Sequence, residues 1–376
     1  MKITIKENNN TMMNNMYQQL MPIIKVNPEV SPKEQLASRL NNSIFLAGPC
    51  PRKDYTNDWR YKAFDILNRL GFKGNVITPT NDRFQELRDK YGKESLRVQT
   101  EWETIAMKKA SAIVFWVDRH IDKGFPAFTT NIEFGDWYNK PGVFCGFPDD
   151  TDKNDYLKVR LEQEKIPYWN DLETMLSAVV ERLNRPSGKF FTSDTHFSQQ
   201  RTLELSRRPF VDVDNMDLEM ISNWNKTVTM NDEVYHAGDF GDISTMRDIV
   251  SCLNFKTLHF VLGNYDRKIL PEIEQALSGM GRDIILSSAE EFDEGGKHYY
   301  VVHEPDEGTE TPKYPDNIVL YGHIHGRAFA KKNGFDLATD YHRYTPISME
   351  QVAWFANAIQ YWDHNVFCEE ASVYGV

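Results

Sequence analysis

Residues 190–196 read FFTSDTH, and this stretch organises the second half of the chain. A short apolar strand that feeds Asp-x-His places a carboxylate, Asp194, and an imidazole, His196, at the strand's carboxyl end. Because oxygen and nitrogen ligands suit ions such as Mn, Fe, Zn and Ni, the stretch predicts part of a metal site. Taken alone, this stretch is weak evidence for a metal site. Asp-x-His occurs by chance in many chains, and a lone histidine is most often a packed or surface residue.

Later stretches supply matching ligands in a fixed order. Each follows a short β-branched or aromatic run that predicts a strand. The further donors are Asp239, Asn264, His303, His323 and His325. A set this large, without thiolate, predicts two divalent transition-metal ions (Mn, Fe, Zn or Ni) that lie close together.

The same half, residues 189 to about 350, resembles the calcineurin-like metallophosphoesterases, which fold as a four-layer α/β/β/α sandwich. The resemblance implies hydrolysis of a phosphate ester, because a metal pair makes hydroxide available near neutral pH and holds phosphoryl oxygens during in-line attack. It also implies how the ligands divide. The first metal would be held by Asp194, His196 and His325, the second by Asn264, His303 and His323, with Asp239 as the bridge.

Two positions depart from that family. Tyr265 stands where the family usually has the histidine that protonates the leaving oxygen, and Gln199 stands where many relatives have another histidine. A phenol, with an unperturbed pKa of about 10, can donate a proton but matches this role poorly at neutral pH. We therefore expect a preference for diesters or activated monoesters. The alternative is that the second half of the chain binds metal and phosphate but hydrolyses its substrate slowly.

The first half alternates apolar strands with helical periodicity. The pattern predicts strands at residues 44–47, 76–79, 112–117 and 142–145, separated by helices at residues 59–70 and about 99–109 and by one starting near residue 129. Such alternation is typical of a doubly wound parallel sheet of the flavodoxin or Rossmann kind, in an α/β protein. Ligands bind such sheets beyond the strands' carboxyl ends, so we expect the chemistry near Gly48, Arg52, Glu103 and Glu133.

Two carboxylates are the candidate catalytic groups of this half. We expect Glu133 in the first turn of its helix, where the helix dipole keeps it ionised and able to attack an anomeric carbon. We expect Glu103 at the start of the preceding helix, in reach of a nucleobase. Helix capping is the alternative for both. Gly48 and Arg52 are the substrate-binding candidates, with Arg52 either receiving a phosphate or remaining a solvated surface residue.

Residues 43 to about 145 resemble the nucleoside 2-deoxyribosyltransferase-like domains. The likeness rests on FLAGP at residues 45–49, Trp59-Arg60, the strand ending in Phe115-Trp116, and IEFG at residues 132–135. It implies that Glu133 is the nucleophile on the sugar C1′ and that Glu103 contacts the base. The family's additional aspartate just before the nucleophile is absent, because Ala127 and Phe128 stand there. Both the deoxyribose preference and the choice between transfer and hydrolysis therefore stay open.

The 376 residues divide into an N-terminal extension, residues 1–40, and two domains, residues 41–185 and 186–376. The Asn- and Met-rich extension is either partly ordered or an arm that packs on a neighbouring subunit, which leaves a homo-oligomer open. The net charge of −12 opposes binding to long nucleic acid. The cysteines are widely spaced, and the sequence shows neither a signal peptide nor a long apolar span. We therefore expect a cytoplasmic protein that acts on small molecules and has no membrane partner.

The two halves together predict a bifunctional enzyme of nucleotide metabolism. One domain would cleave or exchange an N-glycosidic bond of a nucleoside or nucleotide, and the other would hydrolyse a related phosphate ester. Two alternatives remain: a phosphoesterase with a nucleotide-binding regulatory module, and a non-catalytic nucleotide binder.

Overall fold

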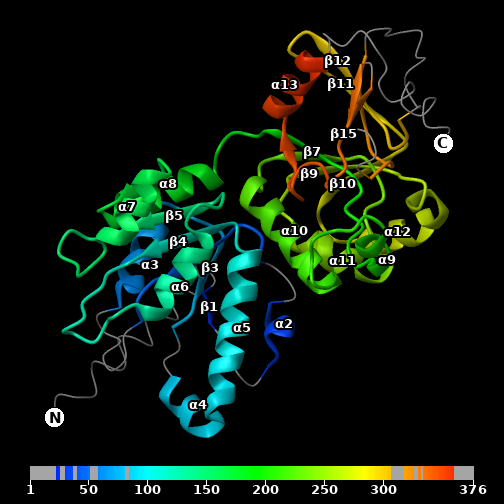
Figure 1. The fold of residues 1–376 in the computed structure, drawn as a ribbon. Coiled ribbons are helices and arrows are strands. Elements are labelled where there is room, and N and C mark those ends of the chain that lie inside the picture. The colour runs from blue at the N-terminus through cyan, green and yellow to red at the C-terminus, as the bar shows by residue number, and fades with distance from the viewer. Residues whose placement is uncertain are drawn as a thin grey trace. The chain divides into compact units, whose positions relative to one another are not determined.

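The computed structural model describes residues 23–25, 30–36, 40–50, 58–80, 84–305, 317–325, 329–331 and 333–359. The chain divides into two compact units, Met1–Arg185 (unit 1) and Pro186–Val376 (unit 2), which Figure 1 draws with their elements labelled. The helical face expected near residues 12–21 and the candidate Arg52 lie outside the described residues.

Unit 1 is built on one parallel sheet. Its strands are β1 (Ile23–Lys25), β2 (Ser43–Ala47), β3 (Asn75–Thr78), β4 (Ala112–Trp116), β5 (Val143–Gly146) and β6 (Tyr168–Trp169). They lie in the order β1-β3-β2-β4-β5-β6, with every neighbouring pair parallel. The strand order reverses between β2 and β4, which is the topological switch point of a doubly wound sheet. The expected architecture of the first half is confirmed.

Helices cover both faces of this sheet. They are α2 (Pro32–Gln35), α3 (Trp59–Arg69), α4 (Phe84–Tyr91), α5 (Lys93–Lys109), α6 (Phe128–Trp137), α7 (Asp155–Gln163) and α8 (Leu172–Leu183). Successive residues of a strand point to opposite faces, so Ile44 and Leu46 of β2 share a core with α3 and α8. On the opposite face Phe45 contacts Trp102 of α5, and Phe115 of β4 contacts Phe134 of α6. Helices α5 and α6 therefore share one face beside the switch point.

Unit 2 is a sandwich of two sheets. The first has the order β10 (Asp283–Ser287), β9 (Thr257–Val261), β8 (Glu233–His236), β7 (Lys189–Thr192) and β16 (Ile347–Ser348). The second has the order β11 (Glu290–Glu294), β12 (Lys297–Val301), β13 (Ile318–Tyr321), β15 (Gly334–Asp336) and β14 (Ala330–Lys331). Phe191 and Tyr235 of the first sheet share a buried core with Val301 and Leu320 of the second, so the sheets pack face to face.

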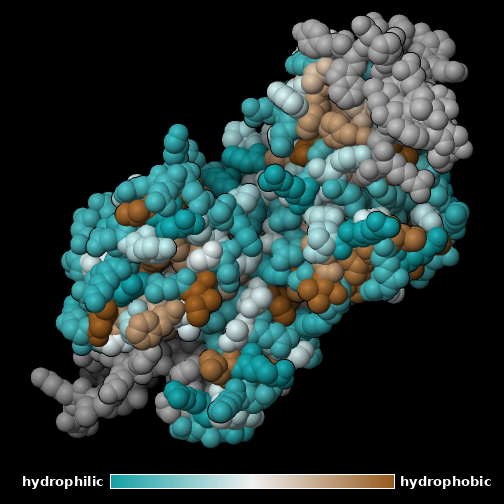
Figure 2. Space-filling model, viewed as in Figure 1, coloured by the Kyte–Doolittle hydropathy of each residue, from teal (hydrophilic) through white to brown (hydrophobic). Residues whose placement is uncertain are grey.

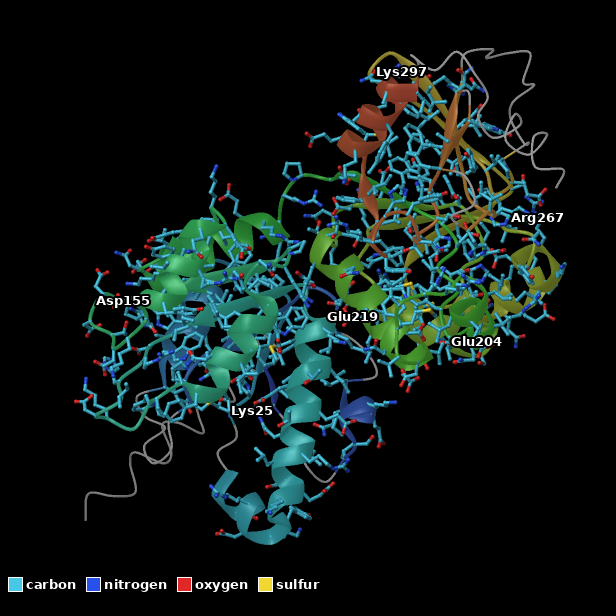
Figure 3. The ribbon with its side chains drawn as sticks, in the orientation of Figure 1. Lys25, Asp155, Glu204, Glu219, Arg267 and Lys297 are labelled. Carbon is cyan, nitrogen blue, oxygen red and sulfur yellow. The ribbon has the colours of Figure 1, made fainter. Side chains whose placement is uncertain are left out.

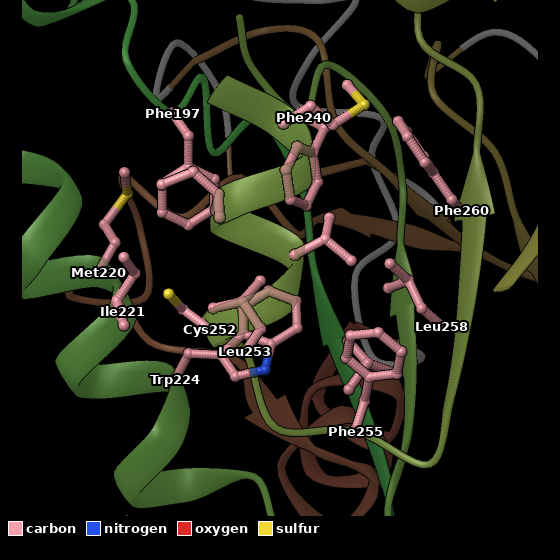
Figure 4. Packing of buried hydrophobic residues seen from close by; sticks show 14 of the residues in the cluster. Phe197, Met220, Ile221, Trp224, Phe240, Cys252, Leu253, Phe255, Leu258 and Phe260 are labelled. Carbon is pink, nitrogen blue, oxygen red and sulfur yellow. The ribbon is translucent and has the colours of Figure 1, made fainter. Parts of the chain in front are cut away.

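Helices complete the sandwich. They are α9 (Gln200–Leu205), α10 (Val213–Thr227), α11 (Ile243–Cys252), the 3-10 helix η2 (Asp266–Ile269), α12 (Leu270–Leu277) and α13 (Met349–Ile359). Figure 4 shows the core between α10, α11 and the first sheet, where Trp224 is buried among Phe255 and Leu258 and donates its indole N–H to the Asn254 carbonyl at 2.8 Å. On the other side of the β7 sheet, Val352 and Ala356 of α13 join the inter-sheet core. The expected metallophosphoesterase-like α/β sandwich is confirmed.

The surface agrees with the composition. Figure 2 shows a face on which hydrophilic residues predominate, with scattered apolar side chains. Among the helices that the structure describes, none combines the length and the hydropathy needed to cross a bilayer.

Gly48 follows β2 at the switch point and yields a stability prediction. Its φ is +153°, and a Cβ there would stand 2.3 Å from the Trp116 carbonyl oxygen. Gly135 of α6 lies in the opposite situation, because a Cβ there would meet nothing within 4 Å. We expect Gly48→Ala to destabilise unit 1 by about 2 kcal/mol or more, and Gly135→Ala to stabilise it by about 0.5–1 kcal/mol.

Calorimetric unfolding of the two single variants checks this contrast. Equal shifts of the two unfolding temperatures would contradict the close approach of β2 and β4 at Gly48.

Candidate functional sites

The polar loops of unit 2 that follow parallel strands hold the predicted metal ligands. Asp194 and His196 follow β7, Asp239 follows β8, and Asn264 follows β9, three neighbouring strands of one sheet. His303 follows β12, and His323 and His325 follow β13, in the other sheet. Because the carboxyl ends of parallel strands meet at one edge, the structure brings all of these side chains together.

One group of donors comprises Asp194, His196 and His325. The two imidazole Nε2 atoms lie 3.0 Å apart, and the Nε2 of His325 lies 3.5 Å from an oxygen of Asp194. Two nitrogens bound at right angles to one ion, each at about 2.1 Å, would also be about 3.0 Å apart. The spacing therefore fits a shared metal ion.

The second group comprises Asn264, His303 and His323. The Nε2 of His303 lies 3.1 Å from the Asn264 side-chain oxygen and 3.2 Å from Nδ1 of His323. Between the groups, Oδ2 of Asp239 lies 3.5 Å from Nε2 of His303 and 3.9 Å from Nε2 of His196. Asp239 thus stands where a ligand common to two ions would stand.

The backbone at these positions is strained. Left-handed φ angles occur at Asp194 (51°), His196 (48°), Asp239 (55°), His323 (78°) and His325 (45°). For residues other than glycine, each such conformation costs on the order of 1–3 kcal/mol and persists only where its surroundings enforce it. A glycine allows close packing here, because a Cβ on Gly322 would stand 2.2 Å from Oδ2 of Asp194. Such strain clusters at functional sites, which supports the reading of the loops as a binding site.

Neighbouring groups fix the orientation of the imidazoles. His196 donates from Nδ1 to the Gln199 side-chain oxygen at 2.7 Å, which directs its Nε2 lone pair toward His325. Nδ1 of His325 lies 3.3 Å from the Ser206 hydroxyl and 3.7 Å from Asp340, and Asp340 accepts two bonds from Arg208, at 2.9 and 2.8 Å. Sequence reasoning missed Arg208 and Asp340, because no local motif marks them.

The pKa values of the donor side chains follow from their burial and from these pairings. Burial acts to lower the pKa of His303, but the hydrogen bond to Asp239 and the charges of Asp194 and Asp239 raise it to about 9. Burial acts to raise the pKa of Asp239, yet His303 and His196 lower it overall. Metal binding at His303 would therefore displace a proton, as metal sites generally do.

A pocket of about 370 Å³ opens onto both donor groups. Besides the ligands it is lined by Gln199, Arg201, Leu205, Tyr265 and Ile324. Tyr265, the candidate acid, has 44% of its surface exposed. Its backbone N–H donates to Oδ1 of Asp239 at 3.1 Å, which holds the Tyr265 backbone beside the donors.

In unit 1 the structure places Glu103 and Glu133 close enough for each carboxyl group to affect the pKa of the other. Glu103 also accepts a bond from the Gln99 amide at 2.7 Å. Burial and the neighbouring charge of Glu103 raise the pKa of Glu133 to about 7, and burial likewise raises the pKa of Glu103. Burial and the closeness of the two carboxyl groups therefore disfavour ionisation of both at once.

The expected helix positions of these residues are wrong. Helix α6 begins at Phe128, so Glu133 lies in its second turn and not in the first. Helix α5 begins at Lys93, so Glu103 lies in its interior. Burial therefore outweighs any effect of the helix dipole, which fades beyond the first turn.

Arg60 is a functional neighbour that sequence reasoning did not assign. It is 1% exposed, pairs with Asp58 at 3.1 Å, and donates to the carbonyls of Gly48 and Pro49 at 2.9 and 3.0 Å. Its charge opposes the rise in the pKa of both glutamates. Gly48 thus lies in a loop held by a buried cation that also acts on the carboxylate pair.

The Asp340 contact gives a test of the donor arrangement. Asp340→Asn keeps the shape of the side chain but removes the charge that orients His325, so metal affinity should fall by about 10–100-fold. Chelator competition on the full chain measures this affinity. Asp293→Asn is the matched control, because the Asp293 side chain is 84% exposed and lies on β11. Equal affinity in the two variants would show that Asp340 does not position His325.

Comparisons with known proteins found one matching family model in each half of the chain. A family model described as nucleoside 2-deoxyribosyltransferase like matches residues 41–151, and one described as a calcineurin-like phosphoesterase superfamily domain matches residues 190–339. The uncharacterized protein MJ1445 of Methanocaldococcus jannaschii is 24% identical over 174 residues, which cover 43% of this chain and 88% of that protein.

Among solved structures, the protein of unknown function AQ665 from Aquifex aeolicus matches with a TM-score of 0.33 and 21% identity, over 45% of this chain and 99% of that chain. The two family models cover separate parts of the sequence, one in each compact unit. The chain is therefore a fusion of a nucleoside 2-deoxyribosyltransferase-like domain with a calcineurin-like phosphoesterase domain.

Proposed function

We propose that unit 2 is a dinuclear-metal phosphoesterase. The observation that supports this most strongly is the convergence of two pairs of imidazoles on Asp239. One pair is His196 with His325, and the other is His303 with His323. The donors are oxygen and nitrogen atoms only, which suits Mn, Fe, Zn or Ni. When bound, such a metal pair supplies a nucleophile near neutral pH and stabilises charge on the phosphoryl oxygens.

The chain's own residues would position the reaction. Gln199 and Asp340 hold the imidazoles of His196 and His325 in place. The pocket also contains Arg201, whose guanidinium can bind an anionic phosphoryl group. Tyr265 is the side chain available to protonate the leaving oxygen. Because a phenol is a weak acid for that purpose, the proposal favours diesters and activated monoesters as substrates.

For unit 1 we propose cleavage or exchange of an N-glycosidic bond of a nucleoside or nucleotide. The supporting observation is the closeness of Glu103 and Glu133, since neighbouring carboxyl groups that do not both ionise can divide acid and nucleophile roles. With the proton on Glu103, ionised Glu133 would attack C1′ and form a glycosyl ester. The C1′–N electron pair would leave with the base, which Glu103 holds or protonates. Water or a second base would then release the sugar.

Together the two proposals describe a bifunctional enzyme of nucleotide metabolism. If unit 1 binds a nucleotide without breaking it, the chain is instead a phosphoesterase with a regulatory module. Chromatographic detection of free base from a panel of nucleosides and nucleotides separates these two functions.

The phosphoesterase proposal predicts metal-dependent hydrolysis of bis(p-nitrophenyl) phosphate by the full chain. Asp239→Asn should lower the rate by at least about 100-fold, because a metal pair stabilises the transition state by several kcal/mol. Elemental analysis of the same sample should show loss of metal. An Asp239→Asn variant with normal metal content and normal activity would overturn the assignment.

The glycosidic proposal predicts that Glu133→Gln abolishes base release while phosphoesterase activity stays near that of the wild type. Wild-type base release should fall as the pH drops below about 7, because Glu133 becomes protonated there. Base release by Glu133→Gln at the wild-type rate would leave only the regulatory role.

Stability of the same variant is the control for folding. The pKa of Glu133 is higher in the folded protein than in the unfolded chain. Protonation of Glu133 therefore contributes to folding stability in full below the pKa of the unfolded chain, and this contribution is lost as the pH rises through about 7. Glu133→Gln stays neutral, so unit 1 should unfold at a higher temperature than wild type at pH 8, with a much smaller difference at pH 4, below the unfolded pKa. Lost activity together with that gain cannot come from misfolding.

A further inference from the structure

Two exposed apolar side chains and one half-buried apolar side chain line the rim of the metal-site pocket. Leu205 is 69% exposed and Tyr265 is 44% exposed, and both line the pocket together with Ile324. Large apolar side chains of the described residues are mostly buried, so these stand out. We call Leu205, Tyr265 and Ile324 the apolar rim. Its members come from three separate loops or helices, and Ile324 also packs against a small core cluster of Val302, Val319 and Tyr321.

A cation stands beside the apolar rim. Arg201 lies on α9, lines the same pocket and forms no ion pair with any residue that the structure describes. Glu204, labelled in Figure 3, lies on the same helix but accepts a bond from Gln200 at 3.0 Å. Arg201 is therefore free to meet an anion that enters the pocket.

The pocket is larger than a phosphoryl group needs. Its volume of about 370 Å³ falls within the range of sites that enclose whole small molecules, about 300–1,000 Å³. The Tyr265 ring centroid lies 6.2 Å from that of His196, at an interplanar angle of 78°, so an aromatic face stands next to the donor groups. The hydrogen bond from the Tyr265 backbone N–H to Asp239 fixes the backbone that carries this ring next to the donors.

We propose that the apolar rim is a leaving-group subsite that binds a flat aromatic ring of the phosphate ester. Tyr265 stacks on the ring, Leu205 and Ile324 enclose its edges, and Arg201 binds the anionic part of the substrate. The substrate class is therefore an ester of an aromatic alcohol or of a nucleoside, not of a simple alkyl alcohol. This inference rests on the phosphoesterase function proposed above. Rings stack on aromatic side chains whatever their substituents, which fits a subsite of this kind.

Competitive inhibition of the metal-replete full chain by phenylphosphonate and methylphosphonate tests the subsite. The two probes share the phosphonate group, cannot be hydrolysed and differ in the ring. Phenylphosphonate should bind about tenfold more tightly to the wild type, in line with the stacking of one ring. The ratio of the two inhibition constants measures the preference for the ring. This ratio should be smaller in Tyr265→Ala and in Leu205→Ser, and it should approach one in the double variant.

Two further variants separate stacking from other effects. Tyr265→Phe should keep the preference, because it keeps the ring and removes only the hydroxyl. Val211→Ser is the control for loss of an exposed apolar side chain, since Val211 is 91% exposed and does not line the pocket.

The possible failures are distinguishable. Equal inhibition of the wild type by both phosphonates, or weakening of both to the same degree in Tyr265→Ala, would overturn the subsite and leave the phosphoesterase function standing. Absence of metal-dependent hydrolysis and of inhibition by either probe would overturn the function itself.

Discussion

The hydrogen bond from the His323 backbone N–H to the Asp194 carboxylate, at 2.9 Å, links the two sheets of unit 2 where its site is built. Asp194 belongs to the loop after β7 in one sheet, and His323 to the loop after β13 in the other. Both residues have left-handed backbone conformations. The link therefore holds two strained loops against each other, and the spacing of the remaining donors depends on it. A buried core between the sheets stabilises this arrangement against the cost of the strain.

Unit 1 illustrates a different constraint. Two carboxyl groups are held close together beside a buried arginine, and burial raises the pKa of both. Such a pair disfavours the ionised folded state near neutral pH. Arg60 limits that cost, since its charge opposes the shift while its hydrogen bonds hold the loop after β2. A destabilising pair of this kind is expected where function, not stability, determines the residues.

Local pattern was sufficient to place the candidate donors at strand ends, but it did not indicate the groups that lie beside them. Asp194, Asp239 and His303 each follow an apolar strand, and the sequence shows both the strand and the donor. Arg208 and Asp340 meet across 132 positions of the chain, so no local pattern indicates their contact. The starts of α5 and α6 were misplaced for a local reason. Their N-cap residues, Gly92 and Ala127, make no side-chain capping bond, so the usual polar start signal is missing.

The central claim is the dinuclear site of unit 2, and metal K-edge X-ray absorption of the full chain loaded with manganese tests it most directly. The account predicts two ions per chain, nitrogen and oxygen ligands without sulfur, and a metal–metal separation of about 3.5–4 Å. A single ion per chain with no metal–metal scattering, or sulfur in the ligand shell, would contradict it.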